Sequence, residues 1–294
     1  MASQHQFGGS WTEEKLDRVR KYLAAYTTIF TQNSRAATLR TIYVDAFAGT
    51  GYRTASSQHT STALPLFADE DATSLQQGSA AIALETEPPF DHYLFVEQVA
   101  ERVVALQQLR QHFSHRAQQI TIIHDNANTF LRQWCRDTDW RTHRAVVFLD
   151  PYGMEVEWAT IEAIAQTHAI DLWLLFPLGQ AVNRLLTRHG PPEESWAQRL
   201  TQMFGTEAWK DAFYRAPTQG TLFGAETTLE KDADFDAIGA FFVQRLETVF
   251  AQVVKKPLPL RNTKNVPIYL LCFAAGNPKG APTAVKIASH ILRR

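Results

Sequence analysis

Short apolar runs alternate with helix-like segments through the middle of the chain. The runs at 92–97, 120–124, 145–150 and 171–178 are almost continuously apolar and contain many β-branched and aromatic residues. Each of the first three is followed by a segment with helical spacing. Strands without polar alternation are buried on both faces, as in a parallel sheet covered by helices. With a first run at 41–49 and a last one at 267–275, the pattern predicts a doubly wound, mostly parallel, Rossmann-like α/β fold.

The alternation stops between residues 180 and 262. That range contains helical patterns at 191–204 and 234–254 and no clear strand. We therefore predict an α/β domain made of residues 1–179 and 263–294, with an N-terminal helix that Ser10 begins. Residues 180–262 are predicted to be a helical insertion over the carboxyl edge of the sheet, used for substrate or partner recognition. Residues 52–77 contain much Ser, Thr, Ala and Gln and predict a long loop, of a length that is often functional.

Composition narrows the class of protein. With 45% hydrophobic and 20% charged residues, the 294-residue chain suits a folded protein with a sizeable core. No run approaches the roughly 20 apolar residues of a membrane span, and the first ten residues lack the pattern of a secretion signal. We expect a cytoplasmic protein. Two cysteines, Cys135 and Cys272, and ten scattered histidines predict neither a disulfide framework nor a structural metal.

Charge is unevenly distributed. Residues 251–294 contain eight Lys or Arg and no acid, although the whole chain has a net charge of −1. Such a bias indicates an anionic partner, for which a nucleic acid is a candidate. A solvated basic face without a partner explains the bias equally well.

Four acids stand at the ends of four predicted strands: Asp45, Glu97, Asp125 and Asp150. In an open α/β sheet, ligands bind beyond the carboxyl ends of the strands, so these acids are expected in one crevice. Glu97 is a candidate to accept both hydrogens of a ribose diol, and Asp125 or Asn126 to bond an adenine ring. Each acid alone is equally typical of a surface position, and Asp125 is a candidate cap for the helix starting near Ala127.

The loop after the first strand reads D-A-F-A-G-T-G. Its glycines allow the backbone to approach a ligand, and Asp45, Phe47, Gly49 and Gly51 are candidate cofactor-binding residues. A dinucleotide fingerprint, G-x-G-x-x-G, would need a third glycine where Thr54 stands. A nicotinamide-dependent oxidoreductase is therefore the weaker alternative.

Several segments carry a family resemblance: YVDAFAGTGYR, GSAAIAL, LFVE, FLDPYGM, FPLGQAVNRLL and NPKG. Together they resemble class I S-adenosylmethionine-dependent methyltransferases, and more closely the three-Cys-motif partner (TcmP) family. The resemblance implies S-adenosylmethionine as cofactor and a neighbouring three-Cys-motif protein as partner.

The D-P-Y segment is where the resemblance implies catalysis. Asp150 and the carbonyl of Pro151 would accept the hydrogens of an exocyclic amine, and Tyr152 would stack on a flipped base. A plain turn is the alternative, because Asp-Pro and Gly153 are both typical of turns. A non-catalytic partner protein with the same fold is a further alternative, since amino-methyltransferases usually have a second proline in this segment. Candidate substrate-binding residues are Tyr52, Arg53, Ser79, Asn183 and Arg184.

Overall fold

The computed structural model describes residues 10–34, 36–49, 78–216 and 229–293. The main sheet has the order β3-β2-β1-β4-β5-β10-β8, and β9 also pairs with β10. Its strands are β1 (Arg40–Asp45), β2 (His92–Glu97), β3 (Ile120–His124), β4 (His143–Leu149), β5 (Ile170–Phe176), β8 (Gln252–Val253), β9 (Leu258–Arg261) and β10 (Pro267–Ala275). The first five are parallel and β10 runs antiparallel beside β5. This doubly wound, mostly parallel arrangement confirms the predicted Rossmann-like fold class.

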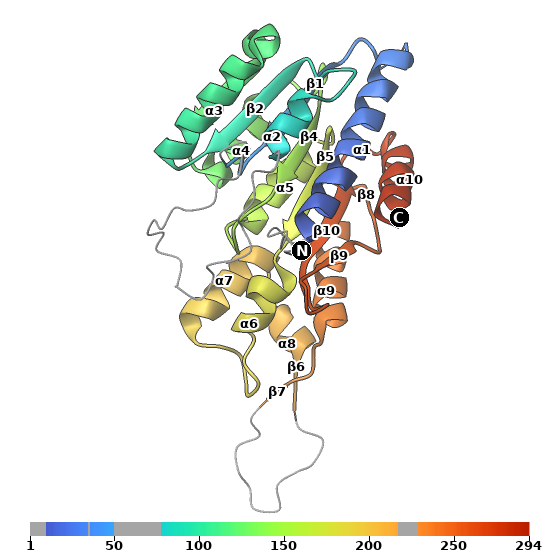
Figure 1. Ribbon diagram of the computed structural model, residues 1–294. Coiled ribbons are helices and arrows are strands. Elements are labelled where there is room, and N and C mark those ends of the chain that lie inside the picture. The colour runs from blue at the N-terminus through green and yellow to red at the C-terminus, as the bar shows by residue number, and fades with distance from the viewer. Residues whose placement is uncertain (1–9, 35, 50–77, 217–228, 294) are drawn as a thin grey trace, which may run out of the picture.

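Helices cover both faces of the sheet (Figure 1). One face packs on α1 (Ser10–Gln32), α2 (Ser79–Leu84), α3 (Ala100–His112) and α10 (Ala281–Leu292). The other packs on α4 (Ala127–Asp137), α5 (Trp158–Gln166), α7 (Glu194–Phe204), α8 (Trp209–Phe213) and α9 (Phe235–Glu247). The apolar run 145–149 of β4 is unbroken because its side chains alternate between the two cores. Val147 packs in one core and Val146 in the other. None of the described helices is both long enough and apolar enough to cross a membrane.

The range 180–262 is only partly helical, so the expectation that it holds no strand is wrong. Strands β8 and β9 join the main sheet, and β6 (Tyr214–Arg215) pairs with β7 (Glu230–Lys231) in a small second sheet. Three of these strands have two residues and β9 contains Pro259, so none is long or regular enough to produce a strand pattern. The helix predicted for 234–254 ends at Glu247, and Val253 already belongs to β8. That residues 180–262 recognise a substrate or partner stays a prediction.

A π-helical turn (Leu178–Val182) and α6 (Asn183–Leu185) directly follow the carboxyl end of β5, and α7 and α8 gather beside them (Figure 1). Gly179 stands inside the π-helical turn. A Cβ there would come within 2.1 Å of the Pro267 carbonyl oxygen, so glycine permits β10 to pack closely.

A buried acid lies under α1 at the amino end of the sheet. Asp171 accepts a hydrogen bond of 2.6 Å from the Tyr22 hydroxyl, and burial raises its pKa from 3.8 to about 7, although the Tyr22 hydrogen bond opposes the rise. The folded state therefore holds this proton more tightly than the unfolded chain does. The stability that follows is fully present below about pH 4 and is lost as pH rises through about 7.

We expect Asp171→Asn to flatten the pH dependence of the unfolding free energy between pH 4 and 8. The flattening has an upper value of about 4 kcal/mol, because one pKa unit corresponds to about 1.4 kcal/mol. Urea titrations across this range measure it, with the exposed Asp236→Asn as control. A slope that Asp171→Asn leaves unchanged would show that Asp171 titrates as in the unfolded chain.

Candidate functional site

The four strand-end acids lie along one edge of the sheet. Asp45 and Glu97 are the last residues of β1 and β2, while Asp125 and Asp150 follow β3 and β4. Because β1 lies between β2 and β4, and β3 flanks β2, the four strand ends are neighbours in space. The parallel sheet thus brings together carboxylates that are up to 105 positions apart in the sequence.

Glu97 connects the first loop to the end of β2. Its Oε2 accepts a hydrogen bond of 3.1 Å from the Gly49 N–H, and its Oε1 accepts one of 2.8 Å from the Val99 N–H. Gly49 has a φ of +59°, a conformation that favours glycine. The Arg102 guanidinium lies 3.8 Å from Oε2. Each carboxylate oxygen has two acceptor sites, so the buried carboxylate retains capacity for a ligand hydroxyl.

A cavity of about 140 Å³ opens beside Glu97. Its lining comes from the ends of β1, β2 and β3 and from the segment after β4: Ala46, Phe47, Glu97, Gln98, Val99, Arg102, Asp125, Asn126, Ala127, Asn128, Tyr152 and Glu155. Whole small-molecule ligands usually occupy about 300–1,000 Å³. The described residues therefore form a space that suits part of such a ligand, such as a sugar ring.

Asn126, and not Asp125, caps α4. The Asn126 side chain accepts hydrogen bonds of 3.0 and 3.2 Å from the N–H groups of Asn128 and Thr129. The alternative that Asp125 is the cap is therefore wrong. Asn126 takes that position because it directly precedes the first helical residue, and its amide oxygen reaches the free N–H groups. Asp125 is left exposed among the residues that line the cavity, and its Oδ1 accepts a hydrogen bond of 2.7 Å from the Asn126 N–H.

Tyr152 is one of the residues that line this cavity. Its side chain is 60% exposed, which is unusual for a large aromatic ring. The Arg102 guanidinium lies 4.6 Å from the ring centroid, within the range of a cation–π contact. Arg102 therefore contacts both Glu97 and Tyr152. An exposed ring beside a carboxylate-lined cavity can stack on a planar ligand.

Asp150 forms an ion pair that the sequence pattern did not reveal. Its carboxylate accepts a hydrogen bond from Lys15 of α1, whose side chain is only 1% exposed. The Lys15 ammonium also lies 5.4 Å from the Trp11 ring and 6.0 Å from the Phe148 ring. A signal was present: Lys15 stands on the buried side of α1, between Trp11 and Val19. A lysine in such a stripe indicates a buried acidic partner.

Asp45 is fully buried and does not line the cavity. Its Oδ1 accepts a hydrogen bond of 3.3 Å from the Phe47 N–H, while Oδ2 makes none within the described part of the chain. The pKa of Asp45 is raised from 3.8 to about 7, mainly by burial and in part by the charge of Asp150. The Ser79 hydroxyl, the Phe47 N–H and the Lys15 ammonium oppose this rise. A cation reaching Oδ2 would favour the ionised form.

The remaining candidate residues fall into three groups. Pro151 is buried beside Asp150, and Ser79 is buried near Asp45. Asn183 and Arg184 lie on α6 but outside the cavity lining, and the Asn183 Oδ1 accepts a hydrogen bond of 2.6 Å from Lys231. Gly51, Tyr52 and Arg53 lie outside the described residues.

No family model and no curated protein sequence matches this chain. Among solved structures, protein LPL1258 from Legionella pneumophila, of family DUF519, aligns over 98% of this chain and 92% of its own, with 12% identity and a TM-score of 0.49. Spermidine synthase from Thermotoga maritima aligns over 91% and 60% (11% identity, TM-score 0.38). An rRNA methylase from Streptococcus thermophilus aligns over 72% and 93% (14% identity, TM-score 0.29). Because these identities and TM-scores are low, any inference about function rests on the sheet order and the side chains of this chain.

Proposed function

We propose that this protein is an S-adenosylmethionine-dependent methyltransferase that acts on an exocyclic amine of a nucleic-acid base. One observation carries the proposal. A cavity lined by Glu97 and Asp125 lies beside an exposed aromatic ring, Tyr152, two residues after the strand-end Asp150. This juxtaposition suits a nucleoside on one side and a planar base on the other.

The residues present fit the cofactor. Glu97 retains acceptor sites for ribose hydroxyls, and the exposed Asp125 can accept a hydrogen from an adenine amine. The buried Oδ2 of Asp45 lacks a described hydrogen-bond partner, which suits a positively charged amino group such as that of the methionine part. When bound, S-adenosylmethionine supplies the electrophilic methyl group.

The D-P-Y segment would prepare the substrate amine. The Asp150 carboxylate, oriented by Lys15 through one oxygen, offers its other oxygen to an amine hydrogen. The Pro151 carbonyl offers a second acceptor. Accepting these hydrogens stabilises positive charge that develops on nitrogen and directs its lone pair toward the methyl group. Tyr152 would hold the base by stacking, which contributes about 1–3 kcal/mol per base.

Glu97→Gln is expected to weaken S-adenosylmethionine binding by about 10- to 100-fold. A hydrogen bond to a charged group contributes about 1.5–3 kcal/mol, and the amide loses both the charge and one acceptor. Isothermal titration calorimetry measures the change. The exposed Glu101→Gln, in the first turn of α3, is the matched control. Equal affinity of the two variants for S-adenosylmethionine would show that Glu97 does not contact the ribose.

We also infer that the chain belongs with the three-Cys-motif partner proteins and docks a neighbouring three-Cys-motif protein. The FLDPYGM, FPLGQAVNRLL and NPKG segments support this inference. Co-expression and affinity capture with a three-Cys-motif protein test it. A stable complex supports it, and two separately migrating proteins at micromolar concentration contradict it.

The Lys15–Asp150 pair favours a second candidate function, a non-catalytic protein with the methyltransferase fold. In that case Lys15 neutralises Asp150 permanently and the pair only fastens α1 to the sheet. The two candidates differ in one measurement. Transfer of radioactive methyl groups from S-adenosylmethionine to total RNA or DNA supports the enzyme, and S-adenosylmethionine binding without transfer supports the non-catalytic protein.

A further inference from the structure

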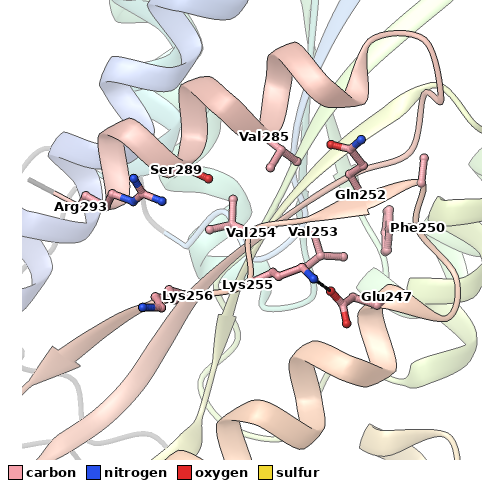
Figure 2. Close-up of a pocket in the computed structure, with 11 residues that line it drawn as sticks. Glu247, Phe250, Gln252, Val253, Val254, Lys255, Lys256, Val285, Ser289 and Arg293 are labelled. Atoms are coloured by element: carbon pink, nitrogen blue, oxygen red, sulfur yellow. Dashed lines mark ion pairs between the residues drawn. The ribbon is translucent and has the colours of Figure 1, made fainter.

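A larger groove lies far from the candidate methyl-transfer site. It has a volume of about 690 Å³ and runs between the end of α9 and α10, across β8 at the edge of the sheet (Figure 2). Gln252 of β8 pairs with Ala275, which in turn pairs with Asp171 near the start of β5. The groove is therefore at the amino edge of the parallel strands, opposite the edge that holds Asp150.

The groove combines an apolar floor with a basic rim. Val254 and Val285 contribute to the floor, and Lys255 and Lys256 come from the segment after β8, with Lys255 directed toward Glu247 and Lys256 away from it (Figure 2). Arg293 joins them from the end of α10. All three cations are exposed. Among the described lining residues, the one carboxylate is Glu247, which lies 3.8 Å from Lys255.

This composition indicates an anionic ligand with an apolar part. The volume lies within the usual range for small-molecule sites, about 300–1,000 Å³. One of the three cations is partly neutralised by Glu247, which leaves an excess of positive charge at the rim. The Ser289 hydroxyl, one turn before Arg293, adds a hydrogen-bonding group. A nucleotide unit fits these features, with its phosphate on the rim and the C–H face of its sugar against the floor.

We propose that this groove binds the sugar–phosphate backbone of a nucleic acid whose base is methylated at the opposite edge. The inference rests on the proposed function and deepens it, because it requires a polymeric substrate. Three strand spacings of about 4.8 Å and a strand length of about 23 Å separate the two sites by about 27 Å. That span corresponds to about seven or eight base pairs of a duplex at 3.4 Å each. A mononucleotide or short oligonucleotide cannot reach both sites.

The test compares two triple variants in fluorescence anisotropy with a labelled 25-nucleotide RNA. Lys255→Gln/Lys256→Gln/Arg293→Gln removes the rim cations. Arg110→Gln/Lys264→Gln/Lys279→Gln removes the same number of exposed cations outside the groove. The groove variant is expected to bind at least tenfold more weakly at 50 mM salt. Its salt slope should fall by about 2, since each phosphate contact on a single strand contributes about 0.7. The control variant is expected to change affinity less than twofold.

Besides normal RNA binding by the groove variant, three outcomes would overturn this inference. Equal weakening of RNA binding in both variants would mean that binding depends on net charge alone. Failure of the wild-type protein to bind RNA would exclude RNA as the ligand of the groove. Competition by a glutamate-rich peptide as strong as that by unlabelled RNA would instead assign the groove to an acidic protein. Because all substitutions are at exposed positions, unchanged thermal unfolding confirms that both variants fold.

The two proposals can fail separately. If the groove variant binds RNA normally while wild-type protein transfers methyl groups, the groove proposal fails and the enzyme stands. If RNA binding depends on the groove but no methyl transfer occurs with S-adenosylmethionine bound, the proposed function fails and the groove stands.

Discussion

Lys15→Met is expected to lower the free energy of unfolding by about 3–5 kcal/mol. The substitution removes the cation of a buried ion pair and leaves the Asp150 carboxylate, whose side chain is 15% exposed, without its main counter-charge. Methionine retains an unbranched apolar chain, so packing against Trp11 changes little. The Lys15 ammonium also lowers the pKa of Asp45, so its loss places two uncompensated acids at adjacent strand ends. Urea titration at pH 7 measures the effect.

A double variant separates the ion pair from packing. Lys15→Met/Asp150→Asn removes both charges and is expected to regain most of the stability that Lys15→Met loses, because no buried charge remains unpaired. The exposed Lys21→Met, on the same helix, is the matched control and should change stability by less than about 0.5 kcal/mol. If Lys15→Met matches Lys21→Met, the ion pair contributes nothing measurable.

The strands that carry the site could be predicted because their side chains alternate between two apolar cores. Ala145, Val147 and Leu149 face one core and Val146 and Phe148 the other, so β4 has no polar position between Ala145 and Leu149. A continuously apolar run of this kind predicts a strand of a parallel sheet that is buried on both faces. The convergence of the strand-end acids then follows from topology alone.

The details of the site depend on contacts between distant segments, which no local pattern contains. Lys15 and Asp150 are 135 residues apart, and only the packing of α1 over the sheet brings them together. Asp125 and Asn126 are both good caps, and a shift of one residue in the helix start decides between them. Strand β8 forms because β10 offers an open edge beside it, although its own two residues favour no particular structure.

Asp150→Asn is expected to lower methyl transfer by about 10²-fold while leaving S-adenosylmethionine affinity within about threefold. Asparagine keeps an oxygen to which the Lys15 ammonium can donate, but it leaves that buried cation without its counter-charge, so the variant is also expected to be less stable than wild type. The rate falls because the amide lacks the negative charge that would stabilise the developing charge on the amine. Asp150 does not line the cavity beside Glu97, which is why cofactor binding should persist. Single-turnover transfer from radiolabelled S-adenosylmethionine to the RNA identified as substrate gives the rate, and calorimetry gives the affinity.

The exposed Asp139→Asn, which removes a surface ion pair with Arg141, should match wild type in both measurements. Full turnover in Asp150→Asn would assign Asp150 to the attachment of α1 alone and remove it from catalysis. Equal losses of turnover and of cofactor affinity would place Asp150 against the cofactor instead of the amine. A selective loss of turnover is the result that ties the carboxylate at the end of β4 to the chemical step, because only a group that acts on the reacting amine changes the rate without changing the bound cofactor.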